Sequence, residues 1–166
     1  THSTSSAASD VYKRQVYYQS HIGRLANYPL MAAQEDMIGM IMADSGRSPK
    51  AVAPFGGREA RLGTNPISMA IPSELGAPLF LDMATSAAAA GKVNVAVARG
   101  DTVPDGWVIG SDGKPTNDPT QLRQGGALLP LGGPDGGYKG TGLAVMVEIL
   151  CGLLTGLGFG VDPQGK

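Results

Sequence analysis

The sequence predicts a globular protein of mixed helix and strand, in the α/β or α+β class. Short apolar runs of strand length alternate along the chain with segments of helical character, which is typical of that class. Of the 166 residues, 42% are hydrophobic and 16% are charged, a composition that excludes intrinsic disorder. The 25 glycines and 12 prolines follow no three-residue period, which excludes collagen and indicates many tight turns.

Charge and cysteine content exclude further classes of protein. The formal net charge of −1 offers no basic surface for nucleic acid. Cys151 is the single cysteine, so an internal disulfide framework and a multi-cysteine metal site are both excluded, and we expect no bound metal. No apolar secretory leader follows the N-terminus, and we expect a cytoplasmic location.

The N-terminal residues 1–15 look foreign to the rest of the chain. They are rich in Ser and Thr, and their second half (SAASDVYKRQ) resembles a translated library adaptor at the end of a fragmentary sequence. The alternative is a natural disordered tail. We therefore expect one core over residues 16–166, and because the last residues (VDPQGK) form no closing element, we expect a fragment at both ends.

The first part of the core reads as a strand, a helix and a second strand. Residues 16–19 are β-prone. Asn27 is a candidate N-cap for a helix over residues 28–37, with Pro29 in the first turn, where its missing N–H costs nothing. Residues 38–42 form an apolar run short enough for a buried strand.

The middle of the chain reads as a loop, two strands and a helix. Residues 48–63 are rich in Pro, Gly and Arg and predict a loop. Two apolar runs, 66–71 and 79–83, predict strands. Ser86 is a candidate cap for the alanine-rich helix that follows, which Gly100 is expected to end.

The last part reads as short strands, a glycine-rich loop and a helix. We expect a strand about Trp107, a turn at 111–113 and a strand at 128–131. A glycine-rich loop at 132–142 then leads into residues 143–154, which are apolar on every face and predict a buried helix. A membrane span over 141–161 is the alternative, but Glu148 lies in its middle and no basic flank or aromatic belt accompanies it.

His21 is the first candidate for chemistry. It is the only histidine outside the foreign tail, and it lies between a strand-like run and a helix. Imidazole takes up and releases a proton near neutral pH, so it suits general acid–base catalysis. The alternative is a surface or capping histidine.

Arg58 and Arg61 are candidates for binding an anionic substrate. They follow two adjacent glycines (APFGGREAR), and the guanidinium fork matches a carboxylate or phosphate with two parallel hydrogen bonds. The alternative is a turn with both side chains solvated or paired with Glu59.

Two further stretches could face a ligand. Lys139 lies where the glycine-rich loop meets the expected helix, and helix N-termini attract anions, so a phosphate-bearing ligand is one interpretation and a close-packing turn is the other. The stretch is neither a Walker A loop nor a dinucleotide-binding G-x-G-x-x-G turn. Asp82 to Ser86 joins a strand end to small polar residues, which suits either a helix cap or exposed N–H groups facing a ligand.

These stretches, taken in order, resemble one family. The blocks SHIG, VAPFGGREARLGTNP, LDMATS, GKV, GW with DGKPTNDP, LLPLGG and YKGTGLAVMVEIL are similar to the malate/L-lactate/ureidoglycolate dehydrogenases, which are not Rossmann-type enzymes. The resemblance covers about residues 18–160. It implies a largely antiparallel mixed sheet with flanking helices, the family's own NAD(P)-binding domain, truncated at both ends.

The resemblance also implies roles for individual residues. His21 would be the proton donor and acceptor, and Ser45 would contact the substrate. The run Asp82, Met83 and Ala84 would contact the dinucleotide, as would Lys139 with Gly140 beside it. The run 134–136 makes the turn before Lys139 longer than is usual in the family, and the family's N-terminal helical region and C-terminal substrate-binding arginine have no counterpart here.

The implied activity is hydride transfer between NAD or NADP and a small 2-hydroxy or 2-oxo acid. The implied assembly is a homodimer, without nucleic acid or membrane partners. A non-catalytic phosphate- or nucleotide-binding module built on residues 132–142 is the alternative from a different class.

Overall fold

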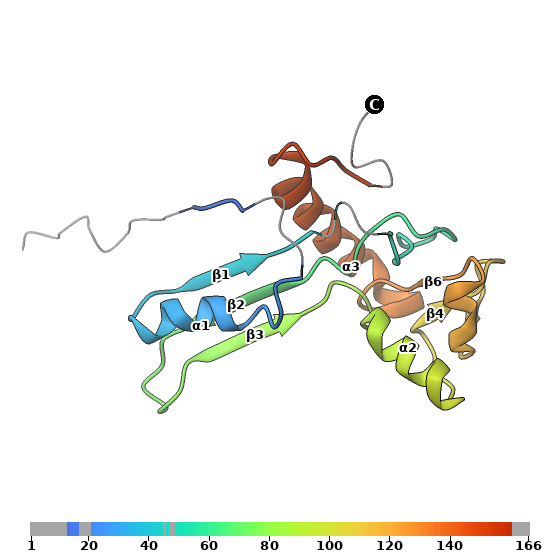
Figure 1. Cartoon of the computed structure of the whole chain (residues 1–166), viewed down its shortest axis with the longest axis horizontal. Coiled ribbons are helices and arrows are strands. Elements are labelled where there is room, and N and C mark those ends of the chain that lie inside the picture. Colours follow the sequence, from blue (N-terminus) through green and yellow to red (C-terminus); the bar gives the residue numbers. More distant parts are fainter. Residues whose placement is uncertain (1–12, 17–20, 45, 47–48, 161–166) are drawn as a thin grey trace, which may run out of the picture.

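The computed structural model describes residues 13–16, 21–44, 46 and 49–160. Figure 1 shows two lobes, one built on β1, β2 and β3 and the other around α2, β4 and β6, with α3 running behind and between them. The predicted mixture of helices and strands is confirmed, in the form of two small antiparallel sheets and three α-helices within the described residues. Most of residues 1–15 and of the β-prone run 16–19 lie outside the described residues.

The first lobe is a three-stranded antiparallel meander with one helix on it. The strands β1 (Gly39–Met42), β2 (Ile67–Ile71) and β3 (Leu79–Met83) lie in the order β1-β2-β3. The helix α1 (Asn27–Gln34) packs on the sheet, and it comes so close that a Cβ at Gly39 would overlap the backbone of Pro29. All three strands follow the predicted apolar runs, but Met40 is 59% exposed, so the expectation that the run 38–42 is buried was wrong.

The second lobe holds the hydrophobic core. It contains α2 (Ala90–Arg99), the short strands β4 (Val108–Ile109), β5 (Pro115–Thr116) and β6 (Ala127–Leu128) in the order β5-β4-β6, and the 3-10 helix η2 (Pro119–Arg123). Apolar side chains from these elements, from the loop before β2 and from α3 pack together; the buried ones are Val52, Leu62, Ala88, Val93, Val103, Val108, Leu128 and Ala144.

Two predicted helix starts were wrong. The N-cap of α1 is Ala26, not Asn27, and the helix ends at Gln34 because Asp36 takes a left-handed conformation (φ 55°). The N-cap of α2 is Ala89, because Ser86 forms a bridge to Pro130 instead. The predicted end of α2 is confirmed, since Gly100 is left-handed at φ 71°.

The glycine-rich segment is helical, which corrects the predicted loop. The helix α3 spans Gly133–Val147 and continues as a π-helical segment, η3 (Glu148–Leu153). Lys139 therefore lies inside the helix, six residues after its start, and not at its N-terminus. The helix is also covered on one side only: Met146 is 53% exposed, because the core contacts α3 through residues such as Ala144 and Val147.

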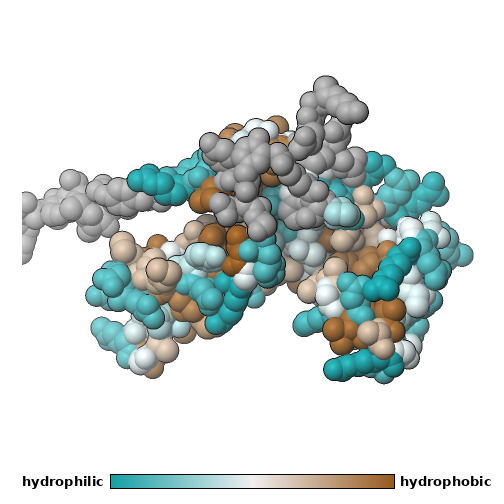
Figure 2. All heavy atoms as spheres, viewed as in Figure 1, coloured by the Kyte–Doolittle hydropathy of each residue, from teal (hydrophilic) through white to brown (hydrophobic). Residues whose placement is uncertain are grey.

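Apolar side chains reach the surface on both lobes. Figure 2 shows hydrophobic atoms over the lobe of α1 and β1–β3 and again around α2. Among the described residues no helix is long and apolar enough to cross a membrane.

Candidate functional site

His21 lies on an exposed segment that leads into α1. This segment is held at two points close to the histidine. The Tyr28 hydroxyl donates to the backbone oxygen of Ile22 at 2.9 Å, and Gly23 makes a left-handed turn at φ 75°. The segment that follows His21 lies next to one strand of the first sheet.

That neighbouring strand is β3, which carries Asp82. The Asp82 carboxylate accepts a hydrogen bond from the backbone N–H of Ala26 at 3.0 Å, and the Arg24 guanidinium lies 5.1 Å from the centre of the Phe80 ring. Residues 24–26, which lead from His21 into α1, therefore lie along β3.

The run from Asp82 to Ala84 is held by the residue after it. Thr85 is buried; its N–H donates to Thr64 O at 2.9 Å, and its hydroxyl donates to Asn65 O at 3.0 Å. Its own backbone oxygen accepts from Leu131 N at 2.9 Å. These bonds fix where the strand end lies relative to the segment that precedes α3.

Leu131, which donates to Thr85, also contacts the helix that carries Lys139 and Gly140. Gly140 is buried against Leu131, and a Cβ at this position would overlap the Leu131 backbone, so only glycine allows α3 this close. Lys139 is exposed beside it, with its amine 5.8 Å from the centre of the Tyr138 ring. The two stretches predicted to contact a dinucleotide thus meet at Leu131.

The predicted arginines follow a loop that packs on α3 next to Lys139, where the Phe55 and Tyr138 rings lie 5.8 Å apart. Their loop contacts α3 through a hydrogen bond from Phe55 N to the Thr141 hydroxyl at 2.9 Å, and Arg58 packs beside Gly113 in the second lobe. Arg61 is exposed and paired with Glu59. In Figure 1 this loop and the segment before α1 lie on opposite sides of α3. Ser45, the predicted substrate contact, lies outside the described residues.

Sequence reasoning missed a buried charged cluster between β1, β2 and α3. The Lys50 amine donates to Glu148 Oε1 at 2.7 Å and to Asp44 Oδ1 at 3.4 Å, and all three side chains are almost completely buried. Asn65 donates to Glu148 Oε1 at 3.3 Å, and Gly160 N donates to Oε2 at 2.9 Å. A lone acid in an apolar stretch was the available signal, because such a charge needs a buried partner.

The pKa of Glu148 reflects two opposing effects. Burial alone would raise it, but the hydrogen bonds from Lys50, Gly160 and Asn65, together with the charge of Lys50, outweigh burial and hold the pKa below its ordinary value. Glu148 is therefore an ionised carboxylate inside the protein at neutral pH.

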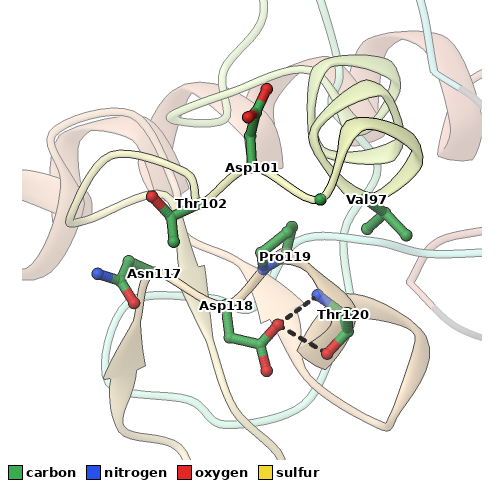
Figure 3. Close-up of a pocket in the computed structure, with 8 residues that line it drawn as sticks. Val97, Asp101, Thr102, Asn117, Asp118, Pro119 and Thr120 are labelled. Carbon is green, nitrogen blue, oxygen red and sulfur yellow. Dashed lines mark hydrogen bonds between the residues drawn. The ribbon is translucent and has the colours of Figure 1, made fainter.

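A shallow hollow between α2 and η2 is not the predicted site. Its volume is about 230 Å³, below the range of roughly 300–1,000 Å³ typical of ligand pockets. Figure 3 shows Asp101 and Asp118 on its wall, with Asp118 bonded to Thr120 as the cap of η2; none of the predicted site residues lines the hollow. The Thr120 hydroxyl, then the Thr120 N–H and Gln121, lower the pKa of Asp118. This carboxylate is thus committed to a structural cap.

Metal chemistry has no candidate site in the part of the chain that the structure describes. No three side chains of His, Cys, Asp or Glu gather there as ligands.

Comparison with known proteins shows the family. The family described as malate/L-lactate dehydrogenase matches residues 15–166, and the chain belongs to it. The chain is 48% identical over 140 residues to a malate dehydrogenase of Pyrococcus abyssi. The aligned region covers 82% of this chain and 38% of that protein. It is 41% identical over 140 residues to the ureidoglycolate dehydrogenase (NAD(+)) of Escherichia coli K12, covering 84% of this chain and 37% of that protein.

A solved structure agrees with the fold. The crystal structure of malate dehydrogenase from Entamoeba histolytica superimposes with a TM-score of 0.78 at 36% identity, covering 86% of this chain and 41% of that one. The chain spans about two fifths of the length of the relatives it matches.

Proposed function

We propose that this chain forms the coenzyme-binding and proton-transfer part of an NAD(P)-dependent oxidoreductase that acts on a small 2-hydroxy or 2-oxo acid. The observation that carries the proposal is the hydrogen bond from Ala26 N to Asp82, because it joins the segment that follows His21 to the predicted coenzyme run. Family membership supports the reaction class, and the names of the relatives support malate, lactate, sulfolactate or ureidoglycolate as the kind of substrate.

The residues present suit a dinucleotide. Asp82 is an exposed carboxylate that can accept a hydrogen bond from a ribose hydroxyl, and Lys139 is an exposed amine that can pair with a phosphate. Met83 and Ala84 lie between them on the chain and are half-buried. When bound, a nicotinamide coenzyme supplies or accepts the hydride. NAD and NADP both remain candidates.

His21 holds and moves the proton in this proposal. Its imidazole takes the hydroxyl proton of a 2-hydroxy acid during oxidation and returns it to the carbonyl oxygen of a 2-oxo acid during reduction. Its exposure gives the substrate access to the ring. Holding the reacting groups in a near-attack geometry can remove up to about 7–11 kcal/mol of the barrier.

The substrate-binding residues stay predictions. Ser45 is proposed from the resemblance, and Arg58 and Arg61 from the chemistry of the guanidinium group. A homodimer and a cytoplasmic location also stay expectations.

Replacing His21 by Gln in the complete protein that contains this chain tests the proposal. We expect coenzyme affinity to stay unchanged and turnover to fall by about 10²- to 10⁴-fold, because only proton transfer is lost. Fluorescence titration with NADH and NADPH, and steady-state rates with 2-oxo acids, measure the two effects. Gln34→Ala, on the exposed side of α1, serves as the control and should change neither.

Unchanged turnover in His21→Gln would reject the proton-transfer role. Coenzyme binding with no reduction of any small 2-oxo acid would favour the alternative of a non-catalytic nucleotide-binding module. That alternative was based on a phosphate-binding loop, whereas residues 133–142 are helical.

A further inference from the structure

The buried cluster around Glu148 contains more charge than packing alone requires. Lys50, Glu148 and Asp44 have side-chain exposures of 5%, 0% and 1%. Removing ions from water is costly, and apolar residues of similar size often stabilise a fold equally well or better. A charged cluster differs from apolar packing because hydrogen bonds depend on direction. The hydrogen bonds of the cluster therefore fix one arrangement of the elements that carry it.

Asn65 extends the cluster toward β2. It is 1% exposed, and its side-chain amide donates both to Glu148 Oε1 and to the backbone oxygen of Ala144 at 3.0 Å. Both partners are acceptors, so the amide has one orientation. The backbone is left-handed (φ 37°), a conformation that Asn adopts more readily than most residues.

A continuous buried path leads from Asn65 to the predicted coenzyme run. The backbone oxygen of Asn65 accepts the hydroxyl of Thr85, which directly follows residues 82–84. Glu148, Asn65 and Thr85 are each 1% exposed or less. One end of the path lies in the helical continuation of α3, the helix that carries Lys139, and the other lies at the end of β3.

We propose that Asn65 and Glu148 are positioning residues for coenzyme binding. They fix α3 relative to the end of β3, so that Lys139 and Asp82 face one ligand at the same time. Lys50 supplies the charge that keeps Glu148 ionised as the acceptor for Asn65. This inference rests on the proposed function, and it adds two residues that touch neither coenzyme nor substrate.

Three variants of the complete protein test it. Asn65→Gly keeps the left-handed backbone but removes the amide. Glu148→Gln removes the charge with little change of shape. The triple variant Asp44→Asn, Lys50→Met and Glu148→Leu removes all three charges together, so that no buried charge is left without a partner. Asp112→Asn, the acid of the exposed pair with Lys114, is the matched control.

We expect the coenzyme Kd to rise roughly tenfold in the three variants, because a small misplacement of binding groups carries a large penalty. The value of kcat at saturating coenzyme should stay within about twofold of the wild type, since His21 is untouched. The triple variant should stay close to the wild-type Tm yet show the weakened Kd, a combination that a purely structural role would not produce. Fluorescence titration, steady-state kinetics and thermal unfolding measure the three quantities.

Three outcomes would overturn the inference. One is an unchanged Kd in folded Asn65→Gly and in the triple variant, while the wild type binds coenzyme. Another is loss of folding in all three variants, which would make the cluster a stability element. If the wild type itself binds neither NADH nor NADPH, the proposed function fails first, and the inference fails with it.

Discussion

Glu148 and Cys151 lie one helical turn apart in η3, and their surroundings change their chemistry in opposite directions. Glu148 is charged inside the protein because three donors surround its carboxylate, one of them the cation Lys50. Cys151 has only a weak contact, from its sulfur to the backbone oxygen of Met42 at 3.5 Å. Burial, followed by the negative charge of Asp44, raises the pKa of its thiol to about 11.

Glu148 should make stability depend on pH in the acid range. Its pKa in the folded protein is lowered, so its contribution is present above the ordinary pKa and is lost as pH falls through the lowered value. In urea unfolding measured from about pH 7 down to about pH 3, the free energy of unfolding should decrease as the pH falls. The decrease should be smaller in Glu148→Gln. Equal slopes for wild type and variant would contradict this.

Cys151 should be slow to react in the folded protein. The thiolate is the reactive form, and a pKa of about 11 leaves little of it at physiological pH. We expect iodoacetamide to modify the native chain roughly a hundredfold more slowly than the urea-unfolded chain at about pH 8. Mass spectrometry over time measures both rates, and similar rates would show that the thiol is not protected.

At the scale of elements, α3 shows why a glycine-rich stretch need not be a loop. Glycine is a poor helix former, so the sequence of residues 132–142 predicts irregular structure. The helix forms because Gly137 and Gly140 let it pack directly on Pro130 and Leu131, where a side chain would collide. Close packing compensates for low helix propensity.

Two glycines of α3 should respond oppositely to alanine. Gly140→Ala should destabilise the fold by about 1–3 kcal/mol, because the methyl group would overlap the Leu131 backbone. Gly142→Ala has open space around it and should stabilise the helix by about 0.5–1 kcal/mol. Chemical denaturation of the two variants measures the difference, and equal effects would contradict the packing argument.

At the scale of the whole molecule, α1 covers only one face of the first sheet. The register places Gly39, Ala70 and Phe80 on the α1 side. The other face is apolar throughout; its residues are Met40, Met42, Ile67, Met69, Ile71, Leu79, Leu81 and Met83. Several of these side chains are exposed, including Leu79 at 58%. An apolar face of this kind promotes association in water.

The 166-residue chain should therefore bind a hydrophobic dye and self-associate through this face. Replacing Leu79 and Leu81 by Lys should reduce dye fluorescence and shift the chain toward monomer, because both side chains project from the uncovered face. Val95→Lys, an isolated exposed position on α2, is the control. Analytical ultracentrifugation and dye titration report the result; equal responses from both surfaces would show that the sheet face has no special role.

Local patterns were enough to locate most elements. The three apolar runs became β1, β2 and β3, and Gly100 ended α2, because chain length, hydrophobicity and glycine conformation act within a few residues. The resemblance in the ordered motifs was enough to assign the family, which the comparisons confirm.

Long-range contacts decided the remaining features. The starts of α1 and α2 and the helical state of residues 133–142 depend on partners far along the chain, such as Leu131 beneath Gly140. The meeting of the segment that follows His21 with Asp82, and the pairing of Lys50 with Glu148 across 98 residues, arise only when the chain folds back on itself. Sequence motifs name the chemical groups, but hydrogen bonds between distant segments determine which groups share a site, because a side chain can act only on atoms within a few ångströms.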